Sequence, residues 1–355
     1  MGGETVCVTG ASGFIGAHLV RALLEAGHTV VGTVRDADND AKTAHLRSLP
    51  GADERLRLVS ADLLAPPGTF DKAVAGCTYV LHSASPYAFG VKDPQADLVD
   101  PAVKGTHSVL HSCAVAGPPT LKRLVLTSSV AAITDEGDGG RVFTSADWNE
   151  KSSLKRLPYY FSKVQAERAA HAFVAADSGT WDLISINPSA VIGPALSAKP
   201  INTSVDSFVV APCNGNLPLI ADLTLGFVDV RDVADAHVAA MTQGTPGSRY
   251  ICSATEVPLA DIVGQLEASG CTRERGFKLP RIVATSGVAG WVLKGIATIV
   301  PGDIGYQMRG LLGNPALYDA TPSKKELGIS YRDWRTTVTD TVRSQAKWGN
   351  VPSLD

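Results

Sequence analysis

Tyr159 and Lys163 are the two side chains in this sequence best suited to acid–base chemistry. They are four residues apart, so a helix beginning after Pro158 would place both on one face, with about 5–6 Å between their Cβ atoms. A free phenol has a pKa near ~10, and a neighbouring ammonium lowers it by favouring the phenolate. Tyr159 could then exchange a proton with an alkoxide near neutral pH. Such pairs also arise by chance in helices, so this interpretation depends on the surrounding elements.

Serine hydroxyls at the end of a predicted strand form the second chemical group. The segment 122–126 is predicted as a strand that delivers Thr127, Ser128 and Ser129 to a sheet edge. Either serine could hydrogen-bond a carbonyl oxygen. Because side chains alternate in an extended chain, only one of the two serines can face the site. Tyr160 is the alternative phenol, but it is three residues from Lys163 rather than four.

A glycine-rich turn near the N-terminus has the pattern of a dinucleotide-binding turn. The run 4–8 predicts a buried strand before it, and leucines at helical spacing predict a helix after it. At such a junction Gly10 permits a tight turn, Gly13 lets a pyrophosphate approach the helix N-terminus, and Gly16 lets helix and strand pack closely. The spacing is G-x-x-G-x-x-G, and a purely structural turn is the alternative.

Basic residues after the second predicted strand favour NADP(H) over NAD. The strand 29–34 runs into Arg35, and Lys42 follows one turn later. A guanidinium matches a 2′-phosphate in a bidentate way, whereas an acid at this point would bind the 2′-hydroxyl of NAD. Asp36 could pair with Arg35 and weaken that role. The alternative is a solvated basic pair.

Two further predicted strands end at residues that could contact the cofactor. The strand 56–60 leads to Asp62, which could hydrogen-bond the adenine amine while Leu63 covers the ring. Asp62 could equally cap a helix. The strand 78–82 ends in small residues, 83–85, which leave room for a ribose–phosphate arm. Ligands of open α/β sheets bind at these carboxyl ends.

The order of the predicted elements defines the fold class as α/β. Strands and helices alternate through a helix over 97–116, a helix over 159–176 and a strand over 182–186, which predicts a Rossmann-type, doubly wound parallel sheet. The segment 134–150 is predicted as loop. Residues 1–194 are expected to form the NADP-binding domain, and 195–355 mainly a substrate-binding cap, with elements at about 225–252 returning to the sheet.

Composition excludes several classes of function. The chain has 355 residues and a formal net charge of −3, so nucleic acid and anionic membranes are not expected as partners. Six scattered cysteines without a C-x-x-C motif predict reduced core residues in a cytoplasmic protein, and no secretory signal is expected at the N-terminus. The apolar segment 282–300 contains Lys294 and several glycines, which favours a helix packed over the substrate side against one lying on a membrane surface.

These motifs resemble the extended short-chain dehydrogenase/reductases, and more narrowly their dihydroflavonol 4-reductase, cinnamoyl-CoA reductase and yeast methylglyoxal (ketone) reductase group. The resemblance rests on the segments Val6–Gly16, Gly32–Asp36, Leu81–Pro86, Leu126–Ser129, Tyr159–Lys163, Asn187–Ser189 and Val228–Ala234. It implies a catalytic triad of Ser129, Tyr159 and Lys163. It also implies NADPH or NADP+ contacts at Gly10, Ser12, Gly13, Phe14, Ile15, Gly16, Arg35, Lys42, Asp62, Leu63, Ser83, Ala84, Ser85, Thr127, Tyr159, Lys163, Pro188 and Val191.

Differences from the family patterns narrow the range of candidate substrates. Flavonoid-reducing members have Asn five residues after the catalytic serine, where this chain has Thr134, and the cinnamoyl-CoA reductase signature Asn-Trp-Tyr-Cys-Tyr is absent around Tyr159. The segment 142–150 resembles the ketone-reductase version instead. Aromatic residues near the predicted site are candidates for the pocket wall, as is Thr134; the aromatic ones are Tyr87, Phe89, Trp148 and Phe208.

The expected function is NADPH-dependent reduction of an aldehyde or ketone by a monomer or homodimer that needs no metal. One alternative is an epimerase, dehydratase or 3β-hydroxysteroid-type dehydrogenase of the same fold. The acid that an NAD-binding epimerase would place after the second strand is replaced here by Arg35. A second alternative is a non-catalytic NADP(H) sensor, which the Tyr159–Lys163 pair argues against.

Overall fold

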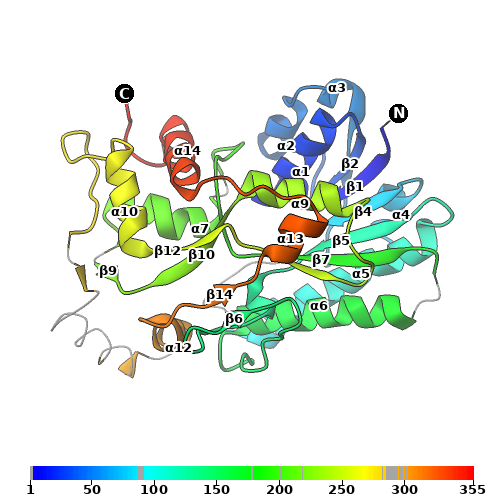
Figure 1. Cartoon of the computed structure of the whole chain (residues 1–355). Coiled ribbons are helices and arrows are strands. Elements are labelled where there is room, and N and C mark those ends of the chain that lie inside the picture. Colours follow the sequence, from blue (N-terminus) through cyan, green and yellow to red (C-terminus); the bar gives the residue numbers. More distant parts are fainter. Residues whose placement is uncertain are drawn as a thin grey trace.

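A parallel sheet of seven strands forms the centre of the molecule (Figure 1). The computed structural model describes residues 3–85, 92–176, 179–199, 201–217, 219–281, 283–284, 295, 299–300 and 302–355. The strand order is β11-β7-β5-β4-β1-β2-β3. The strands are β1 (Thr5–Thr9), β2 (Thr29–Val34), β3 (Leu56–Ser60), β4 (Tyr79–His82), β5 (Arg123–Thr127), β7 (Asp182–Pro188) and β11 (Arg249–Cys252).

Helices cover both faces of this sheet because its strands are apolar on both sides. Val6 and Val8 of β1 pack with Leu19 of α1, whereas Cys7 between them packs with Leu110 of α5. One face carries α1 (Phe14–Glu25) and α9 (Val230–Ala240); the other carries α4 (Asp71–Val74), α5 (Asp100–Ala116) and α6 (Pro158–Ala176). The predicted doubly wound α/β fold is confirmed. Two short helices connect β2 to β3: α2 (Asp40–Arg47) and α3 (Ala52–Arg55).

The second half of the chain builds a smaller sheet with its own apolar core. Strand β10 (Thr224–Asp229) lies between β8 (Ala190–Ile192) and β12 (Thr255–Pro258), parallel to the first and antiparallel to the second. Its core includes Phe227 and Val338. The helices on this side are α7 (Thr203–Val205), α8 (Ala211–Asn214), α10 (Leu259–Ala268) and α14 (Trp334–Lys347).

The segment 195–355 also contributes to the first sheet. Strand β11 pairs with β7, and α9 packs on α1, while β10 stays in the smaller sheet. The predicted loop 134–150 contains one short strand, β6 (Val142–Phe143), because it pairs with β14 (Leu317–Tyr318) far along the chain. Further elements are β9 (Ile220–Ala221), β13 (Val283–Ala284), α12 (Gly302–Leu311), α13 (Thr321–Glu326) and two π-helical segments, η1 (Gln95–Val99) and η3 (Asp206–Val210). The domain boundary at residue 194 stays a prediction.

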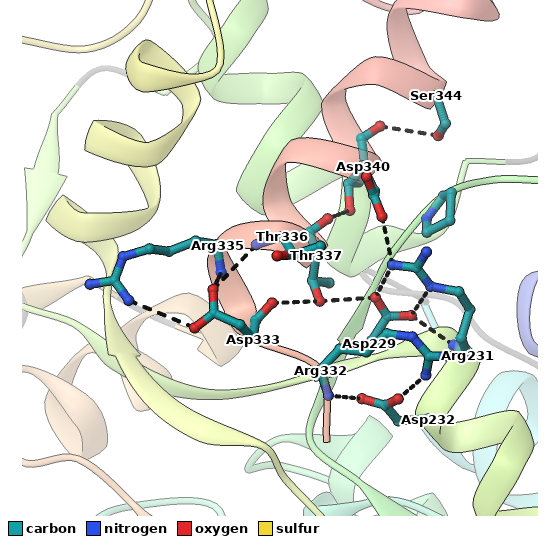
Figure 2. Close-up of polar contacts among 12 residues, drawn as sticks. Asp229, Arg231, Asp232, Arg332, Asp333, Arg335, Thr336, Thr337, Asp340 and Ser344 are labelled. Atoms are coloured by element: carbon teal, nitrogen blue, oxygen red, sulfur yellow. Dashed lines mark hydrogen bonds and ion pairs between the residues drawn. The ribbon is translucent and has the colours of Figure 1, made fainter. Parts of the chain in front are cut away.

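An arginine–carboxylate cluster fastens the C-terminal segment to the start of α9 (Figure 2). We call it the C-terminal clasp: Asp229, Arg231, Asp232, Arg332, Thr337 and Asp340. The Asp229 carboxylate caps α9 by accepting from the Arg231 backbone N–H at 2.8 Å, and it also accepts from the Arg231 guanidinium at 2.7 Å and from the Thr337 hydroxyl at 2.9 Å. Arg231 reaches Asp340 of α14 at 2.9 Å, and Arg332 pairs with Asp232.

The six cysteines are free and buried, as predicted. No helix in the described part of the chain is long and apolar enough to cross a membrane. Most of the segment 282–300, for which a packed or membrane-surface helix was predicted, lies outside the described residues. Within the described ranges, no group of three or more His, Cys, Asp or Glu side chains could hold a metal ion.

Candidate active site

The glycine turn between β1 and α1 has the close packing that a pyrophosphate site needs. Gly10 adopts φ +67°, and a Cβ on it would lie 2.9 Å from the Cα of Ala84. A Cβ on Gly16 would lie 2.1 Å from the carbonyl oxygen of Gly10, so only glycine allows α1 to approach this closely. Gly13 is the N-cap of α1 and provides no side-chain cap, and the first helical turn has no acidic residue. An anion could therefore accept from the first backbone N–H groups of α1. Ser12 lies on this turn, and Phe14 and Ile15 begin α1.

The end of β4 is held against the glycine turn by a buried pair of side chains. The Thr9 hydroxyl is hydrogen-bonded to Nδ1 of His82 at 2.7 Å and accepts from the Ala84 backbone N–H at 3.1 Å. Burial, and then the charge of Lys163, lower the pKa of His82 to about 3, so this imidazole is neutral. These contacts place Ala84 beside Gly10, with Ser83 and Ser85 on either side of it in the chain.

Helix α6 brings the predicted acid–base pair to the same edge. The Lys163 ammonium is 5.8 Å from the centroid of the Tyr159 ring and donates to the Ser85 hydroxyl at 3.0 Å. Burial lowers the pKa of Lys163 to about 8, while the nearby Glu167 carboxylate opposes this shift. Tyr160 packs edge-to-face on Tyr159, with ring centroids 6.0 Å apart. The predicted face of α6 therefore lies at the carboxyl ends of β4 and β5.

The two adjacent serines after β5 have different partners. The Ser128 hydroxyl donates to the buried Glu167 carboxylate at 2.6 Å. The Ser129 hydroxyl accepts from the Ala131 backbone N–H at 3.1 Å and caps a single helical turn, η2 (Val130–Ala132). A hydroxyl that accepts one bond still has its proton to donate. This arrangement favours Ser129 as the serine that faces a substrate. The preceding Thr127 is hydrogen-bonded to His237 of α9 at 2.7 Å.

Sequence reasoning missed three buried polar residues beneath these groups. The Glu167 side chain is fully buried and accepts from Asn187 at 2.9 Å and from Arg249 at 2.8 Å. The sequence patterns include Asn187 only in the motif Asn187–Ser189, and they assign Arg249 no role. Glu167 is four residues after Lys163, so the helical spacing that revealed Tyr159 and Lys163 could have revealed it too.

Arg35 and Lys42, the predicted 2′-phosphate ligands, are both exposed. No ion pair joins Arg35 to Asp36 among the described residues. The Asp36 carboxylate instead accepts from the Asp38 backbone N–H at 3.0 Å. Asp62 accepts from the Leu64 backbone N–H at 2.9 Å, a local turn contact. Exposed cations at the end of β2 remain compatible with phosphate binding.

Leu63 and two residues after β7, Pro188 and Val191, complete the predicted cofactor contacts. Leu63 packs against Gly105 of α5, where an added Cβ would lie 3.1 Å from the Leu63 Cβ. Pro188 ends β7 at the same sheet edge as Ser129, and Val191 lies in β8, where it is buried. Their cofactor roles stay predictions.

The candidate wall residues are less well placed. The Trp148 ring packs against the guanidinium groups of Arg249 at 3.7 Å and Arg168 at 4.9 Å. Phe208 packs edge-to-face on Phe227 in the second core, and the buried Thr134 hydroxyl donates to the Glu136 carbonyl at 2.8 Å. Each of these three side chains has an internal packing partner. Tyr87 and Phe89 lie outside the described residues.

Comparison with known proteins gives a consistent set of relatives. Residues 6–252 match the model of the NAD dependent epimerase/dehydratase family. Cinnamoyl-CoA reductase CAD2 of Medicago truncatula is 44% identical over 256 residues, which cover 70% of this chain and 75% of that protein. A dihydroflavonol 4-reductase of Zea mays is 38% identical over 268 residues, covering 74% and 73%.

A solved structure extends the likeness to nearly the whole chain. The yeast methylglyoxal/isovaleraldehyde reductase complexed with NADPH superposes with a TM-score of 0.76 and 30% identity, covering 98% of this chain and 100% of that chain. The resemblance predicted from the motifs is confirmed. From the match over residues 6–252 and these relatives, we conclude that the chain belongs to the NAD dependent epimerase/dehydratase family, in which it is similar to the cinnamoyl-CoA, dihydroflavonol and methylglyoxal reductases.

Proposed function

We propose that this chain reduces an aldehyde or ketone to an alcohol with NADPH, and that Tyr159 supplies the proton. The observation that carries the proposal is the position of the Lys163 ammonium. It is buried, lies 5.8 Å from the centre of the Tyr159 ring, and bonds Ser85 at the strand end beside the glycine turn. The reductases named above and the NADPH of the yeast structure support the enzyme class and the cofactor.

The residues present fit a dinucleotide. The close approach at Gly10 and Gly16 and the uncapped start of α1 leave backbone N–H groups for a pyrophosphate. Arg35 and Lys42 would hold a 2′-phosphate, and Lys163 would hold the nicotinamide ribose. When bound, the cofactor supplies a hydride.

The side chains of this protein then have separate tasks in the proposed reaction. Ser129 donates a hydrogen bond to the carbonyl oxygen of the substrate and holds it near Tyr159. The Tyr159 hydroxyl gives its proton to the oxygen as negative charge develops there. Lys163 stabilises the resulting phenolate through its positive charge. Because Lys163 must be protonated for this, its lowered pKa predicts that reduction declines above about pH 8.

The test is the loss of NADPH absorbance when the purified protein meets a panel of carbonyl compounds. The panel contains small aldehydes, α- and β-ketoesters, a cinnamoyl-CoA and a dihydroflavonol, with NADH in parallel. Turnover with NADPH on some members is the expected result and identifies the substrate class. NADPH binding without any turnover would contradict the proposal and favour a sensor, and tightly bound NAD in the purified protein would favour an epimerase.

A further inference from the structure

A buried ion pair lies one helical turn below the proposed acid–base pair. Tyr159, Lys163 and Glu167 follow each other at four-residue spacing on α6, so they share one face of the helix. The Glu167 side chain is fully buried, and that of Arg249 is 7% exposed. A buried carboxylate is costly unless it is paired and hydrogen-bonded.

Glu167 has hydrogen-bond donors from three strand ends. It accepts from Ser128 after β5 at 2.6 Å, from Asn187 of β7 at 2.9 Å, and from Arg249 of β11 at 2.8 and 3.2 Å. Asn187 also donates to the backbone carbonyl of Ser129 at 3.1 Å. Through Asn187, the carboxylate thus connects α6 to the backbone of the proposed substrate-binding serine.

Arg249 uses all five of its N–H groups. Besides the two bonds to Glu167, it donates to the backbone carbonyls of Ser145 at 2.9 Å, Asp147 at 2.6 Å and Ala132 at 3.3 Å. Ala132 ends the helical turn that Ser129 caps. One side chain from β11 therefore fixes both the turn after Ser129 and the segment that leads to α6.

We propose that Glu167 and Arg249 are a positioning pair for the reduction, which hold Ser129 and Lys163 in the arrangement that the chemistry requires. Neither side chain touches the substrate. The inference rests on the proposed function for its kinetic readout, but the position and charge of Lys163 can be tested without turnover.

The electrostatics around Lys163 provide that second readout. Among the described residues, the titratable groups that face Lys163 are Tyr159 and Glu167 on α6 and the neutral His82 on β4. Glu167 in turn faces Arg249 and, at 4.0 Å, His171. The Glu167 carboxylate raises the pKa of Lys163 against the effect of burial. Removing the negative charge should therefore lower that pKa.

The main variant is Glu167→Gln, which keeps the shape and removes the charge. We expect kcat for reduction to fall by about 10- to 100-fold with the fold retained, since small displacements at a reacting centre have effects of this order. The alkaline decline in kcat should move to lower pH. NMR of protein labelled at the lysine ε-carbons, with Lys163 assigned through Lys163→Met, should show its pKa lowered by about half a unit or more.

Arg123 and Asp182 offer a matched control in the same sheet. They form a partly buried ion pair at 2.5 Å, with the Asp182 side chain 32% exposed, at the amino ends of β5 and β7, far from the strand ends of the site. Asp182→Asn should lower the thermal unfolding midpoint while kcat and the Lys163 pKa stay within about twofold and a few tenths of a unit. Equal changes in kcat for the two variants would overturn the proposal.

Ser128→Ala removes one hydrogen bond to Glu167 but leaves the charges of Glu167 and Arg249. It therefore tests the positioning role of the pair if Glu167→Gln does not fold. We expect kcat to fall about three- to tenfold with an unchanged alkaline decline. Wild-type kinetics in Ser128→Ala, or an unchanged Lys163 pKa in folded Glu167→Gln, would refute the pair's role. If the wild-type protein reduces no carbonyl compound, the proposed function is wrong. The NMR titration of Lys163 in wild type and Glu167→Gln then still tests whether Glu167 acts on Lys163.

Discussion

Two arginine–carboxylate clusters, each built around a fully buried carboxylate, connect distant parts of this chain, and they differ in what lies next to them. Glu167 shares a helix face with Lys163 and is linked through Asn187 to the backbone of Ser129, and Arg249 donates to the backbone carbonyl of Ala132. Asp229 and Arg231, in the C-terminal clasp, bond to each other and to Thr337 and Asp340 of α14. Similar ion pairs thus have different tasks. The Glu167–Arg249 pair lies where it can position the proposed reacting groups, whereas the C-terminal clasp attaches α14 to the rest of the fold.

This difference predicts which substitutions should change activity and which should change stability. A side chain beside the site can alter turnover with little effect on folding, whereas one in the clasp should alter folding with little effect on turnover. Four substitutions test this separation, beginning with the largest expected effect.

Tyr159→Phe should cause the largest loss of activity. Loss of a positioned proton donor should lower kcat by about 10²- to 10⁴-fold. The ring is half-buried and keeps its packing on Tyr160, so the variant should remain folded and still bind NADPH. Steady-state kinetics, NADPH titration and thermal unfolding check the three quantities, and retained turnover would assign the proton to another group.

Asp229→Ala is the extreme case on the side of stability. It removes a fully buried acceptor of three bonds from Arg231 and one from Thr337, while Arg231 keeps Asp340. We expect the free energy of unfolding to fall by about 3 kcal/mol. The kcat of the protein that remains folded should stay within about twofold of the wild type. A large loss of kcat in folded protein would contradict the conclusion that the clasp affects stability and not activity.

The pH dependence of this effect sharpens the test. Burial opposes ionisation of Asp229, but its bonds to Arg231 hold its pKa below the usual value. A carboxyl whose pKa is lowered by folding stabilises the native state above its unfolded pKa, about 3.9, and loses that contribution as the pH falls through the folded value. The stability difference between wild type and Asp229→Ala should therefore be constant near neutrality and shrink below about pH 4 in urea titrations.

Arg35→Glu tests an exposed charge that belongs to neither cluster. It should weaken NADPH binding by at least about tenfold and NADH binding by less than about threefold, because only NADPH has the 2′-phosphate. The side chain is exposed, so the unfolding free energy should not change. Equal losses for the two cofactors in fluorescence titrations would refute phosphate recognition at Arg35.

Thr337→Val is the smallest change and stays within the clasp. It removes the hydroxyl that donates to Asp229 at 2.9 Å and keeps the shape of the side chain. The expected loss is about 1 kcal/mol of unfolding free energy, with unchanged kcat. Urea denaturation followed by circular dichroism checks it, and a loss as large as that of Asp229→Ala would mean that the Arg231 bonds contribute little.

Much of this arrangement could be predicted from local sequence patterns. The glycine turn, the strand ends at Ser85 and Ser129, and the shared face of Tyr159 and Lys163 each depend on residues close together in the chain. The bond from Lys163 to Ser85 then joins two predictions made separately. Parallel strands explain this success, because all their carboxyl ends lie at one edge.

The remaining features depend on contacts between residues far apart in sequence. Arg249 meets Glu167 across 82 residues, and β6 meets β14 across some 175. Trp148 is an aromatic residue of the kind that lines substrate pockets, but its ring packs on the guanidinium groups of Arg168 and Arg249. No local periodicity encodes such pairings, since they arise only when the sheet has formed.

Strand β11 has a consequence for the synthesis of this protein on the ribosome. It pairs with β7 at the end of the large sheet, yet it is made 60 residues later, after the whole of β8 and β10. Until residue 252 has emerged, β7 presents an open edge and the Glu167 carboxylate lacks its arginine. A nascent chain that ends near residue 194 would contain every proposed reacting group, but it would lack both the last strand of its sheet and the arginine that pairs with Glu167.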